Sequence, residues 1–158
     1  MIREIEANDN EMVRRVIQTV MPEFGCVGPG YAISDPEVNR MFESYQGEGH
    51  RYFVVDIEGE VVGGAGIAPL LGGDAAVCEL RKMYLMPKVR GRGFGKLLID
   101  HCLEFAKRSY KGCYLETTDR MQAAQDLYRR VGFQRLEERM GKTGHFSCEC
   151  WYHIDLNA

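Results

Sequence analysis

The sequence predicts one layered α/β domain spanning residues 1–158. Three observations indicate this class. The length suits a single domain with one substantial core. Periodicity predicts the order strand, two helices, three strands, helix, strand, helix and two strands, with no repeat or linker. A glycine-rich loop from Arg90 to Gly95 joins a strand to an amphipathic helix.

Local signals justify each element in order. Asn8 or Asp9 can cap the first helix, which continues to about Val20, and Asp35-Pro36 begins a second. The third helix runs from Phe94 to Ser109, and the fourth runs from Met121 to Val131, before Gly132. The expected strands are Ile2 to Glu6, Arg51 to Ile57, Glu60 to Ala68, Ala76 to Met86, Cys113 to Thr117, Gln134 to Met140 and Phe146 to Leu156.

Composition excludes several function classes. A net charge of −3 and a pI near 5.8 give no general basic field, so a nucleic-acid partner is not expected. We expect no membrane span and no signal peptide, because no apolar run is long enough and the N-terminus lacks an apolar core. The six cysteines form no C-x-x-C pair, which favours a reducing, cytoplasmic setting over a disulfide scaffold.

One set of residues has the chemistry of a zinc site: His145, Cys148, Cys150 and His153. The segment from Phe146 to Ile154 alternates, however, so that both cysteines fall on one apolar strand face and His153 on the other. We therefore expect these residues to belong to the core, and no metal.

The loop from Arg90 to Gly95 has the properties of a phosphate cradle. Its glycines allow close approach of the backbone, and the N–H groups at a helix start favour an anion. A P-loop is excluded, because Arg90 and Leu97 replace its first glycine and its hydroxyl residue. A dinucleotide fingerprint is excluded because Lys96 replaces its third glycine. A cluster of basic residues is expected around the loop: Arg81, Lys82, Lys88, Arg90, Arg92 and Lys96.

Two segments resemble a known family. Met83 to Leu98 reads MYLMPKVRGRGFGKLL and is similar to the acyl-CoA-binding core of the GNAT superfamily of N-acetyltransferases. Ala124 to Phe133 reads AQDLYRRVGF and resembles the second hallmark of that family, a helix with Tyr shortly before Gly-Phe. The resemblance extends in outline from Ile2 to Leu156.

The resemblance implies a GNAT-like sheet, mixed and mostly antiparallel, whose fourth and fifth strands splay apart. Acetyl-CoA would be the co-substrate, with its pantetheine paired to the free backbone of the fourth strand. The implied cofactor-binding residues are Met83, Tyr84, Leu85, Arg90, Gly91, Arg92, Gly93, Phe94, Gly95 and Lys96.

Acetyl transfer to an amine needs a base, an acid and an oxyanion donor. Tyr128 matches the general-acid Tyr of the family, and its alternative role is core packing. Glu79 matches the position of the base in some members, whereas others use an ordered water; its alternative role is an ion pair. Leu85 N–H is the implied oxyanion donor. Met121 departs from the family's Asn, so a contact to pantetheine would fall to Gln122 or Gln125.

The acceptor site is the least defined part. The resemblance points to the loop from Cys26 to Asp35, including Tyr31, and to the loop from Gly141 to His145. His145 either contacts substrate or only caps a turn. We expect acetyl transfer to a primary amine of a small molecule through a ternary complex, in a monomer or homodimer. The alternatives are a protein lysine or N-terminal acetyltransferase and a non-catalytic acyl-CoA-binding regulatory module.

Overall fold

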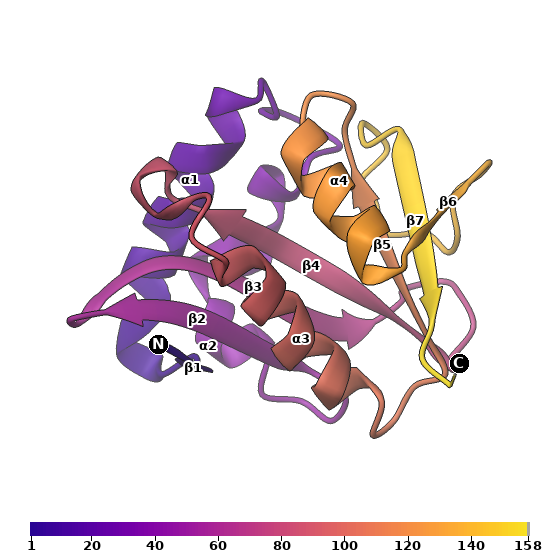
Figure 1. Cartoon of the computed structure of the whole chain (residues 1–158), viewed down its shortest axis with the longest axis horizontal. Helices are drawn as coiled ribbons and strands as arrows, with labels where there is room; N and C mark the ends of the chain where they lie inside the picture. The colour runs from indigo at the N-terminus through magenta and orange to yellow at the C-terminus, as the bar shows by residue number, and fades with distance from the viewer. Residues whose placement is uncertain (158) are drawn as a thin grey trace.

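The computed structural model describes residues 1–157 and contains a seven-stranded sheet in the order β1-β2-β3-β4-β5-β7-β6 (Figure 1). Neighbouring strands are antiparallel except β4 and β5, which are parallel. The strands are β1 (Ile2–Glu4), β2 (Arg51–Ile57), β3 (Glu60–Pro69), β4 (Val77–Leu85), β5 (Gly112–Thr117), β6 (Gln134–Leu136) and β7 (Cys150–Asp155). The predicted mixed sheet is confirmed.

Helices cover both faces of the sheet. Alternate residues of β2 point in opposite directions, so Phe53 and Val55 pack with α3, while Val54 packs with α1. In Figure 1, α3 lies in front of the strands and α1 behind them. The helices are α1 (Asn10–Glu23), α2 (Met41–Ser44), α3 (Phe94–Ala106) and α4 (Gln122–Val131), with 3-10 turns η1 (Ala7–Asp9), η2 (Ala32–Ser34), η3 (Pro36–Asn39) and η4 (Pro87–Val89).

Several predicted elements are shorter in the structure: β1 ends at Glu4, α3 ends at Ala106, and β6, expected to reach Met140, ends at Leu136. The second helix divides into η3 and the single turn α2, because Arg40 leaves helical geometry with a ψ of +49°. The last strand begins at Cys150 rather than Phe146. The Cys148 N–H donates to the His145 carbonyl, so the chain turns before β7, and Phe146 is exposed. The expectation that Phe146 shares the core face was wrong.

The expected splay between β4 and β5 is present. The two strands pair only from Val77 to Glu79, although β4 continues to Leu85. Beyond Glu79, β5 remains paired with β7 on its other side. The second half of β4 therefore has an open edge facing α4 and β5.

A β-bulge in β4 accompanies the splay. The pairing with β3 slips by one residue, so that Ala65 faces both Lys82 and Met83. Lys82 has a φ of +50°, a region that side-chain-bearing residues seldom adopt. The buried Tyr52 hydroxyl donates to the Lys82 carbonyl at 2.8 Å, which holds the bulge in place.

The six cysteines are buried free thiols, in agreement with the sequence analysis. None of the helices between residues 1 and 157 combines the length and the apolar character that crossing a membrane requires.

Candidate active site

The open edge of β4 presents unpaired backbone at Leu85. The next residue, Met86, donates its N–H to the Val62 carbonyl at 2.8 Å. Because alternate residues of an antiparallel strand bond to opposite sides, Leu85 directs its own N–H and carbonyl away from β3. Arg90 Nε donates to that carbonyl at 3.0 Å.

An apolar groove of about 270 Å³ follows this edge toward the start of α3. The groove collects all but one of the residues predicted to bind the cofactor: Met83, Tyr84, Leu85, Arg90, Gly91, Gly93, Phe94, Gly95 and Lys96. Arg92 is the exception, and its guanidinium lies 5.4 Å from the centre of the Phe94 ring.

The glycine loop ends in a helix start that faces the groove. Gly93 caps α3 with a φ of +86°, which glycine adopts without steric cost. The first helical hydrogen bond runs from Leu97 N–H to the Gly93 carbonyl at 3.2 Å, so the preceding N–H groups have no acceptor within the helix. A Cβ on Gly93 would meet nothing within 4 Å. The loop can therefore accept an anion against its backbone.

The basic cluster expected around this loop does not form as a unit. Arg81 pairs instead with Glu79 on β4, and Lys82 pairs with Asp35 and Glu37 at the start of η3. Of the remaining cations, Arg90 pairs with Glu23 and Lys96 pairs with Asp100. The sequence prediction was wrong for Arg81 and Lys82, because the bulge turns β4 between them and the glycine loop.

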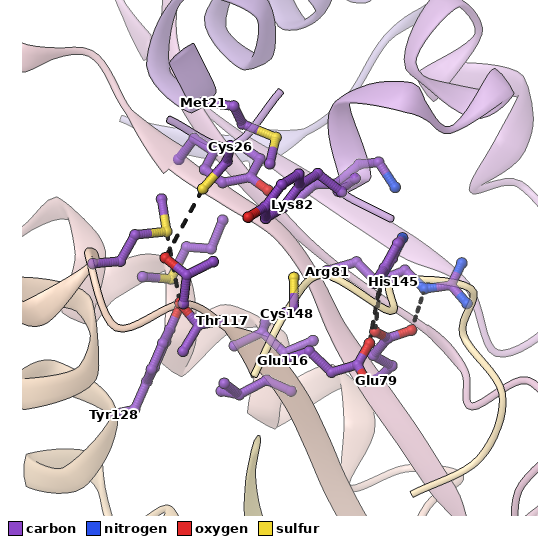
Figure 2. Close-up of a pocket in the computed structure, with 18 residues that line it drawn as sticks. Met21, Cys26, Glu79, Arg81, Lys82, Glu116, Thr117, Tyr128, His145 and Cys148 are labelled. Atoms are coloured by element: carbon purple, nitrogen blue, oxygen red, sulfur yellow. Dashed lines mark hydrogen bonds and ion pairs between the residues drawn. The ribbon is translucent and has the colours of Figure 1, made fainter. Parts of the chain in front are cut away.

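A second, more enclosed cavity of about 50 Å³ lies where β4 and β5 separate (Figure 2). Glu79, Tyr128 and His145 all line it. Tyr128 projects from α4 with its hydroxyl end toward the cavity, as Figure 2 shows. Its ring packs against Phe133, with centroids 5.9 Å apart. The structure therefore brings three predicted site residues from three segments to one cavity.

Burial governs the titration of the two groups predicted to move protons. Burial raises the pKa of Tyr128, and the neighbouring Cys102 and Tyr152 add to this effect. Burial also raises the pKa of Glu79, although the adjacent Arg81 guanidinium partly offsets the rise. A phenol with a raised pKa stays protonated at neutral pH, and a carboxylate with a raised pKa is a stronger base.

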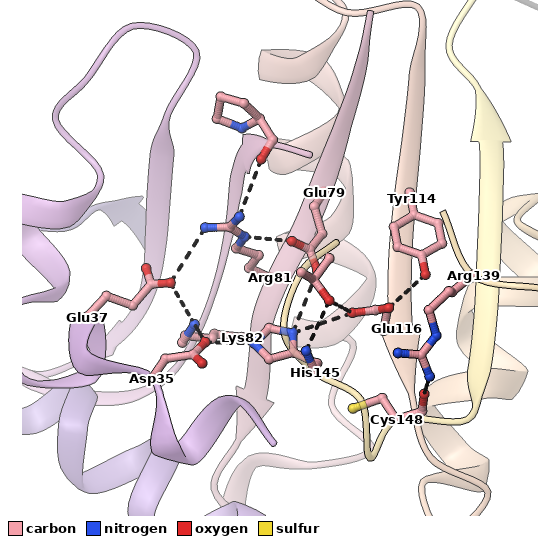
Figure 3. A network of polar contacts seen from close by, with 12 residues as sticks. Asp35, Glu37, Glu79, Arg81, Lys82, Tyr114, Glu116, Arg139, His145 and Cys148 are labelled. Carbon is pink, nitrogen blue, oxygen red and sulfur yellow. Dashed lines mark hydrogen bonds and ion pairs between the residues drawn. The ribbon is translucent and has the colours of Figure 1, made fainter. Parts of the chain in front are cut away.

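Glu79 also forms the ion pair that the sequence analysis offered as its alternative role. Arg81 Nε donates to Glu79 Oε1 at 2.7 Å, and Arg81 also lies 3.5 Å from Glu37 (Figure 3). The other carboxylate oxygen, Oε2, lies 3.9 Å from His145 Nδ1. Glu79 is thus anchored through one oxygen.

His145 connects loops that are far apart in sequence. Its Nε2 lies 2.7 Å from Asp35, and its Nδ1 lies 3.4 Å from Glu116. Burial lowers the pKa of His145, but the hydrogen bonds to Asp35 and Glu116 outweigh it and raise this pKa to about 9. His145 is therefore protonated, and positively charged, at neutral pH. Its contacts thus reach beyond its own turn to Asp35 and Glu116.

The two loops predicted to frame the acceptor site meet where His145 contacts Asp35, and Ser147, just beyond the second loop, bonds to the first. Ser147 N–H donates to the Gly30 carbonyl at 3.1 Å, and Ser147 Oγ donates to the Pro29 carbonyl at 3.0 Å. Tyr31 lines the cavity and accepts a hydrogen bond from Arg120 at 2.7 Å.

Met121 lies where the groove and the cavity meet, and it lines both. Its sulfur accepts a weak hydrogen bond from the Thr117 hydroxyl at 3.6 Å. Gln125 is not available to replace the family's Asn, because its amide donates to the Thr118 carbonyl and accepts from Tyr152. Gln122 is exposed and lines neither cavity.

The four residues considered as a zinc set separate in the structure. His145 gathers with Glu79 and Glu116, whose ligand atoms all lie within 4.8 Å of one another. Cys150 instead donates its thiol hydrogen to Asp119 at 3.0 Å. Because His145 is protonated at neutral pH, both of its ring nitrogens act as donors.

Sequence reasoning did not identify four members of the site: Asp35, Glu37, Lys82 and Glu116. Glu116 lies on β5, where it accepts hydrogen bonds from Tyr114 at 2.8 Å and from Thr143. A charged residue in an otherwise apolar strand was the one available signal for Glu116. Asp35 was included only as the end of the expected acceptor loop and the start of a helix, with no role of its own, and Lys82 was assigned to the wrong region.

Comparison with known proteins identifies the family. The model of the acetyltransferase (GNAT) family matches residues 13–133. The uncharacterized N-acetyltransferase YjgM of Escherichia coli (strain K12) is 43% identical over 150 residues, covering 94% of this chain and 90% of that protein.

Solved structures share the fold. An acetyltransferase of the GNAT family from Staphylococcus aureus Mu50 superposes with a TM-score of 0.83 at 22% identity, covering 99% of this chain and 98% of the other. The acetyltransferase yncA of Salmonella typhimurium, solved with its cofactor acetyl-CoA, gives a TM-score of 0.79 at 17% identity over 100% of this chain and 94% of the other. With the family model matching most of its length, this chain belongs to the GNAT family of acetyltransferases.

Proposed function

We propose that the protein transfers the acetyl group of acetyl-CoA to a primary amine of a small molecule, by direct attack in a ternary complex. The observation that carries this proposal is the cavity between β4 and β5, which Glu79 and Tyr128 both line. The adjoining groove supplies a place for the acyl donor on the other side of Met121. Residues 1–158 would act as one domain.

Acetyl-CoA would occupy the groove. The pyrophosphate would bind the free N–H groups at the start of α3, near Gly91, Gly93 and Lys96. Pantetheine would lie along Met83 to Leu85, on the edge of β4 that is no longer paired with β5. Arg90 is held beside this edge by its bond to the Leu85 carbonyl and would remain close to the phosphates.

Two groups would move protons during the reaction. The amine nitrogen bonds to the thioester carbon, and the C–S bond breaks when the tetrahedral intermediate collapses. Glu79, with its raised pKa, would take the amine proton directly or through water. Tyr128 would give its proton to the CoA thiolate, and Leu85 N–H would stabilise the oxyanion.

The size of the cavity supports a small acceptor. A space of about 50 Å³ bounded by contacting loops admits one amine arm more readily than a folded protein surface. Tyr31 and His145 would contact this acceptor from the two loops.

The test is release of free CoA thiol from acetyl-CoA in the presence of amino acids, their amides, alkyl amines, polyamines, aminoglycosides and lysine peptides. We expect a small amine to be acetylated, with initial-rate plots that intersect when both substrates are varied. Turnover confined to peptides would contradict the small-molecule acceptor. A parallel-line pattern would contradict the ternary complex, because it indicates a covalent acetyl-enzyme.

A further inference from the structure

A charged network that does not balance lies along one side of the cavity (Figure 3). The network combines four carboxylates with three cationic groups, all buried or half-buried. The carboxylates are Asp35, Glu37, Glu79 and Glu116, and the cations are Arg81, Lys82 and His145. Counted as charged groups, they leave one unit of negative charge beside the cavity.

Every cation in this network already has a carboxylate partner. Lys82 Nζ lies 2.8 Å from Asp35 and 2.9 Å from Glu37, and its side chain is fully buried. Arg81 is held by Glu79, and its Nη2 donates to the Pro69 carbonyl at 3.3 Å. An anion entering the cavity would therefore meet no free cation among these groups.

One carboxylate oxygen is left over. Within residues 1–157, Glu79 Oε1 accepts from Arg81, whereas Oε2 has no donor within hydrogen-bond distance. Glu79 is only 2% exposed and lines the cavity, so a molecule in the cavity can contact this oxygen. A largely buried carboxylate oxygen without a protein donor favours a cationic, hydrogen-bonding ligand.

We propose that the acceptor is a small amine that carries no carboxylate next to its reacting nitrogen, and that its ammonium enters the cavity on the free oxygen of Glu79. This inference rests on the proposed acetyl transfer. The ammonium supplies the missing positive charge and donates the missing hydrogen bond. Transfer of its proton to Glu79 then leaves a neutral amine and a neutral carboxyl, ready for attack on the thioester.

The same arrangement discriminates against free amino acids. Once the ammonium has balanced the network, an α-carboxylate would again leave one uncompensated negative charge beside Glu79 and Glu116. At the effective dielectric of a protein, this repulsion corresponds to a preference of about tenfold or more for the uncharged analogue. Arg120 lies outside the network, where it is exposed and bonded to Tyr31.

The test compares alanine with alaninamide, and glycine with glycinamide, because each pair differs mainly in the carboxylate. Rates are compared at equal concentrations of the ammonium form, because that is the form proposed to enter the cavity. We expect kcat/KM for the amide to exceed that for the acid by about tenfold or more. Equal values, or a preference for the acids, would overturn the inference.

Two variants distinguish this charge repulsion from other causes of substrate preference. Glu116→Gln removes one negative charge from the network, and the amide preference should fall by roughly threefold or more. Arg120→Gln is the control, and the preference should stay unchanged. If Arg120→Gln selectively lowers acetylation of the acids, Arg120 receives a carboxylate and the inference is wrong.

The outcome also distinguishes the inference from the function on which it rests. If some amine is acetylated but amides have no advantage, only the charge selectivity fails. If acetyl-CoA binds and no amine of either kind is acetylated, the proposed function fails, and this inference fails with it.

Discussion

The groove proposed to bind acetyl-CoA and the cavity proposed to bind the acceptor share β4, yet they are built in different ways. The groove is formed largely by one continuous stretch, Met83 to Lys96, in which a strand, a glycine loop and a helix start follow one another. The cavity is assembled from segments that lie far apart in the sequence and meet through side chains such as His145 and Asp35. Backbone geometry therefore defines the donor side, and side-chain charge defines the acceptor side.

The largest expected effect is at Tyr128, which lines the cavity and is the proposed general acid. Tyr128→Phe keeps the ring and its packing against Phe133 but removes the proton donor. Turnover should fall by about a hundred- to ten-thousand-fold, the usual contribution of a general acid. Steady-state kinetics measures the loss, and calorimetry should show that acetyl-CoA affinity is retained. Near-normal turnover would reduce Tyr128 to a packing residue.

On the donor side, Gly93→Glu should weaken acetyl-CoA binding by about a hundredfold or more, because it adds a negative charge at the helix start and disfavours the positive φ. Calorimetry checks the affinity. Gly59→Glu is the matched control, since Gly59 also has a positive φ and open space around its Cβ, but lies in the turn between β2 and β3. Unchanged acetyl-CoA affinity in a folded Gly93→Glu protein would contradict phosphate binding by this loop.

On the acceptor side, the charge on His145 should make stability depend on pH. The folded pKa of about 9 lies above the ordinary value of 6.5, so the stabilisation is complete below 6.5 and is lost as the pH rises through 9. The loss should reach up to about 3 kcal/mol in the free energy of unfolding. Urea unfolding of the native protein and of His145→Gln, at about pH 6 and about pH 10, isolates this contribution. Parallel pH profiles of the two proteins would contradict it.

The smallest effect is expected at the rim of the cavity. Tyr31→Ala should raise the acceptor KM by roughly tenfold or less and leave acetyl-CoA affinity intact, because Tyr31 lines the cavity but not the groove. Tyr31→Phe tests the bond from Arg120 alone. Loss of acetyl-CoA binding in Tyr31→Ala would show that the two regions are not separate.

The groove was easier to predict from the sequence than the cavity. The groove was predicted almost completely, since its glycines and helix start are local features whose spacing is visible in one segment. The cavity was predicted only in part. Glu79, Tyr128 and His145 were identified, but Glu116 and Asp35 were not, because their importance depends on contacts between distant segments.

The fold departed from prediction where periodicity competes with turns. The alternation before β7 looked like a continuous strand, but the turn formed by Cys148 N–H and the His145 carbonyl ends it. The bulge at Lys82 was also not locatable from sequence. Lysine has no preference for positive φ, and the conformation is imposed by tertiary contacts such as the Tyr52 hydroxyl.

Lys82 has two structural roles, one through its backbone and one through its side chain. Its backbone carries the bulge that reshapes the edge of β4, and its side chain binds Asp35 and Glu37 on the acceptor loops. Glycine at this position would suit the backbone but would leave both acids without their counter-charge. Most other residues would neither favour the positive φ of the bulge nor supply the counter-charge. We therefore expect the loops around the cavity to vary more freely than position 82, whose backbone shapes the edge of β4 and whose side chain binds Asp35 and Glu37.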